Sequence, residues 1–154
     1  MTVKHVLQTK GSYVATISPD ATLTELVDAL AQHRIGALVV STDGVHIDGI
    51  VSERDIVRCL RSDGGLPECR ESHLLHLDQV HVRDIMTTEV TTCRPETSID
   101  EVMAVITTGR IRHVPVLSKG KLVGLVSIGD IVKARISHLE YERTALVDYV
   151  TTGR

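Results

Sequence analysis

Apolar residues recur with helical spacing in two stretches of the chain. The first stretch comprises Leu23, Leu26, Val27 and Leu30, and the second comprises Ile99, Val102, Met103 and Ile106. The spacing i, i+3, i+4, i+7 places each set on one face of an amphipathic helix. Each set begins with a capping-box pattern, Thr22-x-x-Glu25 and Ser98-x-x-Glu101, which is typical of a helix N-terminus. The pattern predicts two helices that begin alike, 76 residues apart.

Short apolar runs rich in β-branched residues follow each predicted helix. Residues 35–40 (IGALVV) and 111–116 (IRHVPV) are such runs, and they predict buried strands. The turns Asp43-Gly44 and Lys119-Gly120 come next, and each leads into another apolar run. We therefore expect a β-hairpin in each copy.

The clearest repetition lies where the second strand of each hairpin ends. Residues 49–57 read GIVSERDIV and residues 124–132 read GLVSIGDIV, so six of nine positions are identical. The leading segments 3–7 and 82–86 are also similar. A unit of about 60 residues buries little surface alone, whereas two copies can share one core. The sequence predicts an α/β protein of the α+β type, with two pseudo-twofold-related repeats, each a small sheet packed with two helices.

The two repeats are separated by a segment that has no counterpart in either copy. Gly64-Gly65 and Pro67 mark a break there. We expect repeat 1 at residues 1–61, a linker at 62–81, repeat 2 at 82–137 and a helical tail at 138–154, with the two repeats forming one module. The tail region carries Ile136, Leu139, Leu146 and Val147 among charged residues. We expect this tail to pack against a partner subunit or against the leading segment.

Composition narrows the possible partners. The net charge is −3, with 17 basic and 20 acidic residues interspersed, and aromatic residues make up 2% of the chain. No broad cationic face or aromatic platform is therefore expected for nucleic acid. No apolar run approaches the roughly 20 residues of a membrane span, and the N-terminus has no apolar export segment, so we expect a cytoplasmic protein without membrane contact. The three cysteines, Cys59, Cys69 and Cys93, are irregularly spaced, and we expect them to be free thiols.

The motif Ser-x-x-Asp stands at both predicted strand-to-helix junctions. It occurs as Ser52 with Asp55 and as Ser127 with Asp130. One interpretation is structural, because a serine N-cap with an acid at N3 is a capping arrangement worth about 1 kcal/mol. The other is a ligand site, because amides at a helix start attract phosphate and a carboxylate can accept hydrogen bonds from both ribose hydroxyls. Under this second interpretation, Gly49 and Gly124 would let a ligand approach the backbone.

The doubled pattern closely resembles the cystathionine β-synthase (CBS) domain, and its tandem arrangement resembles a CBS pair, or Bateman module. The resemblance covers roughly residues 3–137. It implies a regulatory, signal-transducing protein rather than an enzyme, with clefts between the repeats that bind adenosine derivatives such as AMP, ADP, ATP, NAD or S-adenosylmethionine. It also implies a homodimer that acts on a further protein partner, with no catalytic residue, metal or catalytic cofactor.

Carried over position by position, the resemblance makes Asp55 and Asp130 the ribose-binding acids and makes Ser52 and Ser127 contacts to phosphate or ribose. Two threonines and two strands complete the implied clefts. The full set is Thr16, Ile17, Ser18, Ile35, Ala37, Ser52, Arg54, Asp55, Thr92, Arg112, His113, Val114, Pro115, Ser127 and Asp130. Arg54 could instead form a surface ion pair, and His113 could be a hydrogen-bonded core histidine.

The two copies differ in where they place cations. Copy one has Arg54 before its acid where copy two has Gly129, and copy two has Arg112-His113 in its strand where copy one has Gly36-Ala37. We therefore expect the two clefts to differ in affinity or in ligand.

Two other classes of protein stay open. The chain could be a structural interaction module without a ligand. It could also respond to metal or redox state through Cys69 and the linker histidines, His73, His76 and His81, although Cys-x3-His-x2-His is not a usual structural zinc spacing. No Walker loop, GxGxxG or HExxH motif supports an enzyme.

Overall fold

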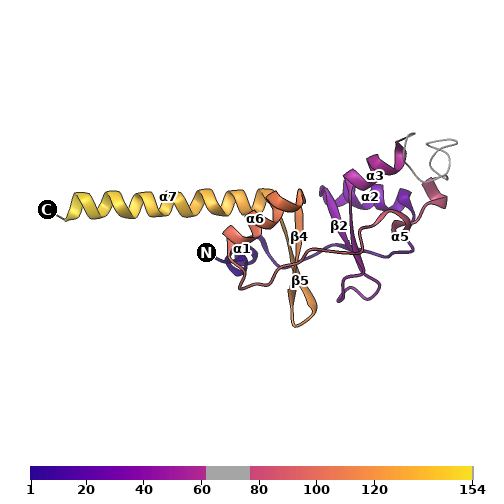
Figure 1. Ribbon diagram of the computed structural model, residues 1–154, viewed down its shortest axis with the longest axis horizontal. Coiled ribbons are helices and arrows are strands. Elements are labelled where there is room, and N and C mark those ends of the chain that lie inside the picture. Colours follow the sequence, from indigo (N-terminus) through magenta and orange to yellow (C-terminus); the bar gives the residue numbers. More distant parts are fainter. Residues whose placement is uncertain (62–76, 154) are drawn as a thin grey trace. The chain divides into compact units, whose positions relative to one another are not determined.

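The computed structural model describes residues 1–61 and 77–153. The chain divides into two compact units. Unit 1 contains Met1–Ser12, Thr92–Ser118 and Val123–Arg154, and unit 2 contains Tyr13–Thr91 and Lys119–Leu122. Both combine helices with a small sheet (Figure 1), which confirms the predicted α+β class.

Unit 2 is built on a three-stranded sheet. Strands β1 (Thr16–Ile17), β2 (Ala37–Val40) and β3 (Gly49–Ser52) lie in the order β1-β2-β3, with β1 parallel and β3 antiparallel to β2. Helices α2 (Leu23–His33), α3 (Glu53–Leu60) and α5 (Val82–Ile85) and the 3-10 turn η1 (Leu77–Gln79) accompany the sheet. The predicted hairpin and the predicted capping box of α2 are both confirmed.

Unit 1 repeats this plan with longer strands. Strands β4 (His113–Ser118) and β5 (Lys121–Ser127) form the predicted hairpin, and helices α1 (Val3–Lys10), α6 (Ile99–Gly109) and α7 (Ile128–Thr152) accompany it. Cys93 adds a parallel bridge to Val116, at the place that β1 takes in unit 2. The capping box of α6 is confirmed, and hydrogen bonds from Ser98 lower the pKa of Glu101.

Each leading segment packs into the core of the other repeat. Val3 and Val6 of α1 are buried in the cluster formed by α6, β4 and β5, whereas Val82 of α5 is buried in the cluster formed by α2, β2 and β3. Equivalent backbone hydrogen bonds hold the two exchanged leading segments in place. They run from Val3 N to Thr97 O (2.9 Å) and from Val82 N to Ala21 O (2.8 Å). A compact unit therefore draws on both sequence repeats.

The leading segments also explain why Gly49 and Gly124 begin the two similar segments 49–57 and 124–132. A Cβ at Gly49 would lie 2.8 Å from the carbonyl oxygen of Thr87, and a Cβ at Gly124 would lie 2.6 Å from Cδ2 of Leu7. The expectation that these glycines make room for a ligand is thus wrong in this structure. The chain itself makes the close approach, and only glycine has no side chain to obstruct it.

Two of the three cysteines, Cys59 and Cys93, lie among the described residues. Cys93 is a free, half-buried thiol, and burial raises its pKa to about 11, which makes it a poor nucleophile at neutral pH. Cys59 is disulfide-bonded, so the expectation of a free thiol there is wrong. Cys69, His73 and His76 lie outside the described residues.

Among the helices that the structure describes, none combines the length and apolar character needed to cross a membrane.

We predict that Gly49→Ala lowers the free energy of unfolding by about 1–3 kcal/mol, because the new methyl group meets backbone that cannot move without disturbing its neighbours. Thr87 and Ile50 exchange two hydrogen bonds of 2.9 Å at that point. Gly124→Ala should cost less than about 1 kcal/mol, because the terminal methyl groups of Leu7 can rotate away. Urea unfolding measures both values.

Gly129→Ala serves as the control, because a Cβ there lies 3.7 Å from Ser127 Oγ, an ordinary contact, in the first turn of a helix. It should leave stability unchanged or raise it slightly. Equal losses for Gly49→Ala and Gly124→Ala would contradict this account of the packing.

Candidate functional site

The first Ser-x-x-Asp turn joins β3 to α3 in unit 2. Ser52 is the N-cap of α3 and has extended backbone angles. Its amide donates a hydrogen bond to Asp55 Oδ2 (2.8 Å), and its hydroxyl donates another to the same oxygen (3.1 Å). The other oxygen, Oδ1, lies 3.6 Å from Nη1 of Arg58, whose side chain is 66% exposed. The Asp55 side chain is only 12% exposed, so the turn holds this carboxylate in a fixed, mostly buried position.

The second turn joins β5 to α7 in unit 1 and holds its carboxylate through the same two serine bonds. Asp130 Oδ2 accepts hydrogen bonds from the Ser127 amide (2.8 Å) and the Ser127 hydroxyl (2.9 Å). The Asp130 amide donates in return to Ser127 Oγ (3.2 Å). Both carboxylates are therefore oriented by the capping interaction that the motif predicts.

A lysine from α1 distinguishes the second turn. Lys10 Nζ lies 2.6 Å from Asp130 Oδ2 and donates to the carbonyl oxygen of Leu125 at 2.9 Å. Burial by itself raises the pKa of Asp130, but the hydrogen bonds from Lys10 and Ser127 and the positive charge of Lys10 outweigh it, so the pKa lies below its ordinary value. Asp130 is accordingly an anionic carboxylate that already has one cation.

The first amide of each helix is not available to a ligand. Glu53 N donates to Gly36 O (3.0 Å), and Ile128 N donates to Arg112 O (2.8 Å). These bonds tie each turn to the strand that begins beside it. Because these amides are already bonded, fewer amides at each helix start can bind a phosphate than the sequence predicts. The carboxylate is then the main polar group of each turn.

The remaining predicted residues of unit 2 lie on or beside β1, β2 and the first turn of α3. Ala37 is the Cα partner of Ser52 in the β2–β3 ladder, and Thr16 is the Cα partner of Val39. Ile17 and Ile35 pack against the hydrophobic core, and Ser18 Oγ accepts a hydrogen bond from Asp20 N (3.2 Å). Arg54 stands in the first turn of α3 with its side chain exposed.

The predicted residues of unit 1 are arranged in a similar way. Thr92 precedes Cys93, whose amide donates to Pro115 O (3.0 Å). His113 begins β4 and is half-buried. Val114 is fully buried in the core of the unit, so only its backbone can face a ligand. Because Ile128 N donates a hydrogen bond to Arg112 O, the backbone of Arg112 lies beside the turn that contains Ser127 and Asp130.

Sequence reasoning missed Lys10. The similarity of the leading segments covers residues 3–7 and 82–86 and ends before this lysine. Its position depends on the exchange of leading segments, and neither composition nor periodicity indicates that exchange.

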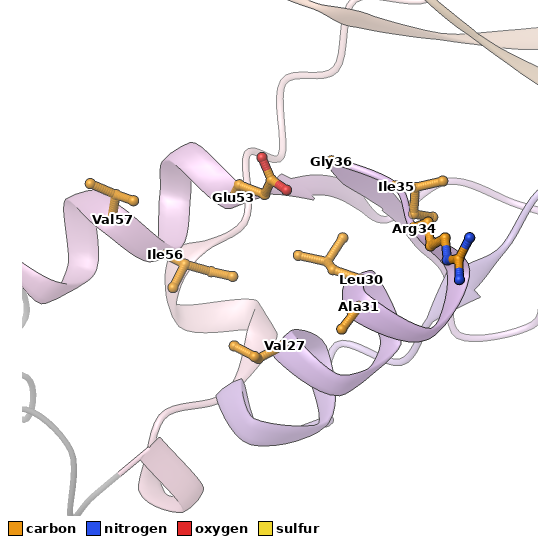
Figure 2. A pocket seen from close by; sticks show the side chains of 9 residues that line it. All are labelled: Val27, Leu30, Ala31, Arg34, Ile35, Gly36, Glu53, Ile56 and Val57. Atoms are coloured by element: carbon orange, nitrogen blue, oxygen red, sulfur yellow. The ribbon is translucent and has the colours of Figure 1, made fainter.

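An apolar groove lies between α2 and α3 in unit 2 (Figure 2). Its volume is about 630 Å³, and Val27, Leu30, Ala31, Arg34, Ile35, Gly36, Glu53, Ile56 and Val57 line it. The groove includes one predicted site residue, Ile35, but neither Ser52 nor Asp55. Because Glu53 belongs to the first Ser-x-x-Asp motif, the groove borders that turn. Within residues 1–61 and 77–153, no three potential ligands cluster to hold a metal ion.

The comparisons with known proteins agree with this architecture. The family model of the CBS domain matches residues 3–62 and 82–137, and the chain belongs to this family. It is 34% identical over 160 residues to the mitochondrial CBS domain-containing protein CBSX3 of Arabidopsis thaliana, covering 99% of this chain and 73% of that protein. It is 29% identical over 133 residues to the CBS domain-containing protein YhcV of Bacillus subtilis, covering 86% of each.

Solved structures show the same fold. The CBS-domain containing protein ATU1752 from Agrobacterium tumefaciens is 40% identical, with a TM-score of 0.76 over 88% of this chain and 99% of that one. The CBS domain pair of MJ0100, solved with 5′-methylthioadenosine and S-adenosyl-L-methionine, is 22% identical, with a TM-score of 0.72 over 90% of this chain and 98% of that one.

We predict that Lys10→Met raises the pKa of Asp130 and lowers the free energy of unfolding at neutral pH by up to about 1 kcal/mol, since the pair is partly exposed. The folded pKa of Asp130 is depressed. Its stabilising effect is therefore fully present above the unfolded pKa of about 3.9 and is lost as the pH falls through the folded pKa. NMR titration of the carboxyl carbon and urea unfolding against pH measure the two effects.

Lys4→Met, on the same helix, is the matched control, because no ion pair joins Lys4 to a carboxylate in the part of the chain that the structure describes. If it shifts the Asp130 titration as much as Lys10→Met does, the assigned pair is wrong.

Proposed function

We propose that this chain is a regulatory protein that binds an adenine nucleotide, AMP, ADP, ATP or NAD, through its two Ser-x-x-Asp turns. The observation that carries the proposal is the pair of carboxylates held in the same way in both units of a CBS-family chain. Vicinal ribose hydroxyls are the part of the ligand that such a carboxylate recognises.

Each carboxylate has one oxygen free of capping bonds. At Asp130, the bonds from Ser127 and Lys10 all fall on Oδ2, so Oδ1 can accept from a ribose hydroxyl. At Asp55, Oδ1 lies 3.6 Å from Nη1 of Arg58, and the exposed side chain of Arg58 can turn away from it. The two turns therefore differ in the cation beside the carboxylate, which is Arg58 at the Ser52 turn and Lys10 at the Ser127 turn.

The comparison with MJ0100 supports an adenosine-containing ligand. Both compounds in that structure contain adenosine. At 22% identity this relative establishes the shared fold, and the ligand at the two turns of this chain stays a proposal. S-adenosylmethionine consequently belongs among the compounds to be tested.

The proposed mechanism is regulation by differential binding. A nucleotide that binds one packing of the two repeats more tightly shifts the population toward it, and a protein partner responds to the changed surface. We propose that the chain acts as a homodimer. Exposed apolar residues beside the groove of unit 2, Val27 and Val57, support such an interface.

We predict that Asp55→Asn combined with Asp130→Asn abolishes nucleotide binding measured by isothermal titration calorimetry with AMP, ADP, ATP, NAD and S-adenosylmethionine. Each single variant should lose affinity at its own turn by about tenfold to a hundredfold, the range expected for hydrogen bonds to a charged acceptor. The two losses should differ in size, because different cations stand beside the two carboxylates.

The matched control is Glu25→Gln combined with Glu101→Gln. These glutamates occupy the same capping-box position on α2 and α6, so the control loses similar helix-capping charge without touching either Ser-x-x-Asp turn. It should bind as the unaltered chain does. Full affinity in the double asparagine variant would refute the site, and absence of binding by the unaltered chain would favour a structural module.

A further inference from the structure

The second half of α7 has no packing partner within its unit. Every residue from Leu139 to Thr152 is exposed, and Figure 1 shows this half running beyond α1 and α6. The match to the CBS family ends at residue 137, so the family pattern does not account for this part of the helix. Isolated helices of about 12–15 residues are marginal in water, and Val147, Val150 and Thr151 are poor helix formers. A partner on its exposed surface would therefore stabilise it.

Exposed apolar residues follow a regular line along this helix. Val132, Ile136, Leu139, Leu146 and Val150 are between 44% and 72% exposed. Together with Arg143 they are separated alternately by four and three residues, which is the a and d spacing of a coiled coil. We call these six residues the α7 seam. Successive residues are rotated by about 100° around the axis of α7. The α7 seam is therefore rotated by about a quarter of a turn from buried Ile131, which faces the core of the unit.

The charges beside the α7 seam favour one orientation of a second copy. In this register Arg135 occupies a g position and Glu140 an e position. In a parallel pair the g residue of one helix meets the e residue of the next heptad in the other, so Arg135 meets Glu140 twice. An antiparallel pair centred between Leu139 and Arg143 would instead set Glu140 against Glu140.

Arg143 fits the same arrangement. A single polar residue at an a position lowers the stability of a coiled coil but fixes its register and number of strands. Glu142 precedes it at a g position, so in a parallel pair each Arg143 lies beside Glu142 of the other copy and gains a compensating charge.

We propose that the α7 helices of two copies of this chain form a short parallel coiled coil through the α7 seam. This interface does not require a bound nucleotide, because its residues include neither Ser127 nor Asp130. It places identical residues of the two copies opposite each other at every a and d position.

Disulfide cross-linking of the full-length chain tests the proposal. Leu146→Cys at a d position should form a covalent dimer under mild oxidation, because in a parallel pair residue 146 meets itself. Asp148→Cys, on the outer face of the same turn, is the matched control and should not exceed the background of the unaltered chain, which has the same three native cysteines. Absence of the Leu146→Cys cross-link, or equal cross-linking of both variants, would overturn the proposal.

Charge reversal then tests the orientation in the Leu146→Cys background. Glu140→Lys should slow cross-linking about three- to tenfold, and adding Arg135→Glu should restore it. Asp100→Asn controls for the intramolecular contact of Arg135, which lies 3.8 Å from exposed Asp100, and it should leave the rate unchanged. Failure of the double reversal to restore the rate would overturn the parallel pairing.

Discussion

Neither repeat of this chain completes its own core, and the leading segment of the other repeat supplies the missing residues. Val3 and Val6 are buried with α6 and β4, and Val82 is buried with α2 and β2. The backbone hydrogen bonds at Val3 and Val82 set the register of both exchanges. Since burial of apolar side chains is the main favourable term in folding, a repeat cut at its sequence boundary would lose part of its core together with these bonds. Each repeat therefore depends on the other repeat to complete its core, in addition to resembling it in sequence.

The same exchange determines the surroundings of the two aspartates. Because α1 belongs to unit 1, Lys10 reaches Asp130, and Asp55 is left with Arg58 from its own helix. A similar exchange fills the space beside Gly49 and Gly124. Two turns with the same motif therefore differ in charge for a reason that lies in the leading segments. The predicted difference between the copies rested on Arg54 and Arg112, whereas the structure adds Lys10 as a further cause.

Local features of this fold could be predicted from the sequence, and contacts between distant segments could not. The helices at 23–33 and 99–109, their capping boxes and both hairpins follow from short-range spacing and turn residues. The Ser-x-x-Asp geometry also follows, because a capping box needs only four residues. The position of Lys10, the disulfide at Cys59 and the contact between Gly49 and Thr87 all depend on which segments meet in three dimensions. No periodicity in a single sequence encodes such meetings.

The capping role and the proposed binding role of each aspartate are compatible because they use different oxygens. Oδ2 accepts the bonds from the serine at the helix start, and Oδ1 accepts neither of them. A ligand at Asp130 would therefore contact the first turn of α7, and the α7 seam continues along the same 25-residue helix. A continuous helix is stiff over this length, so a tilt of α7 at its first turn is carried to its exposed end. The proposed ligand site at Asp130 and the proposed coiled coil are thus joined by one helix, and a change in the packing of its first turn would alter how two copies meet.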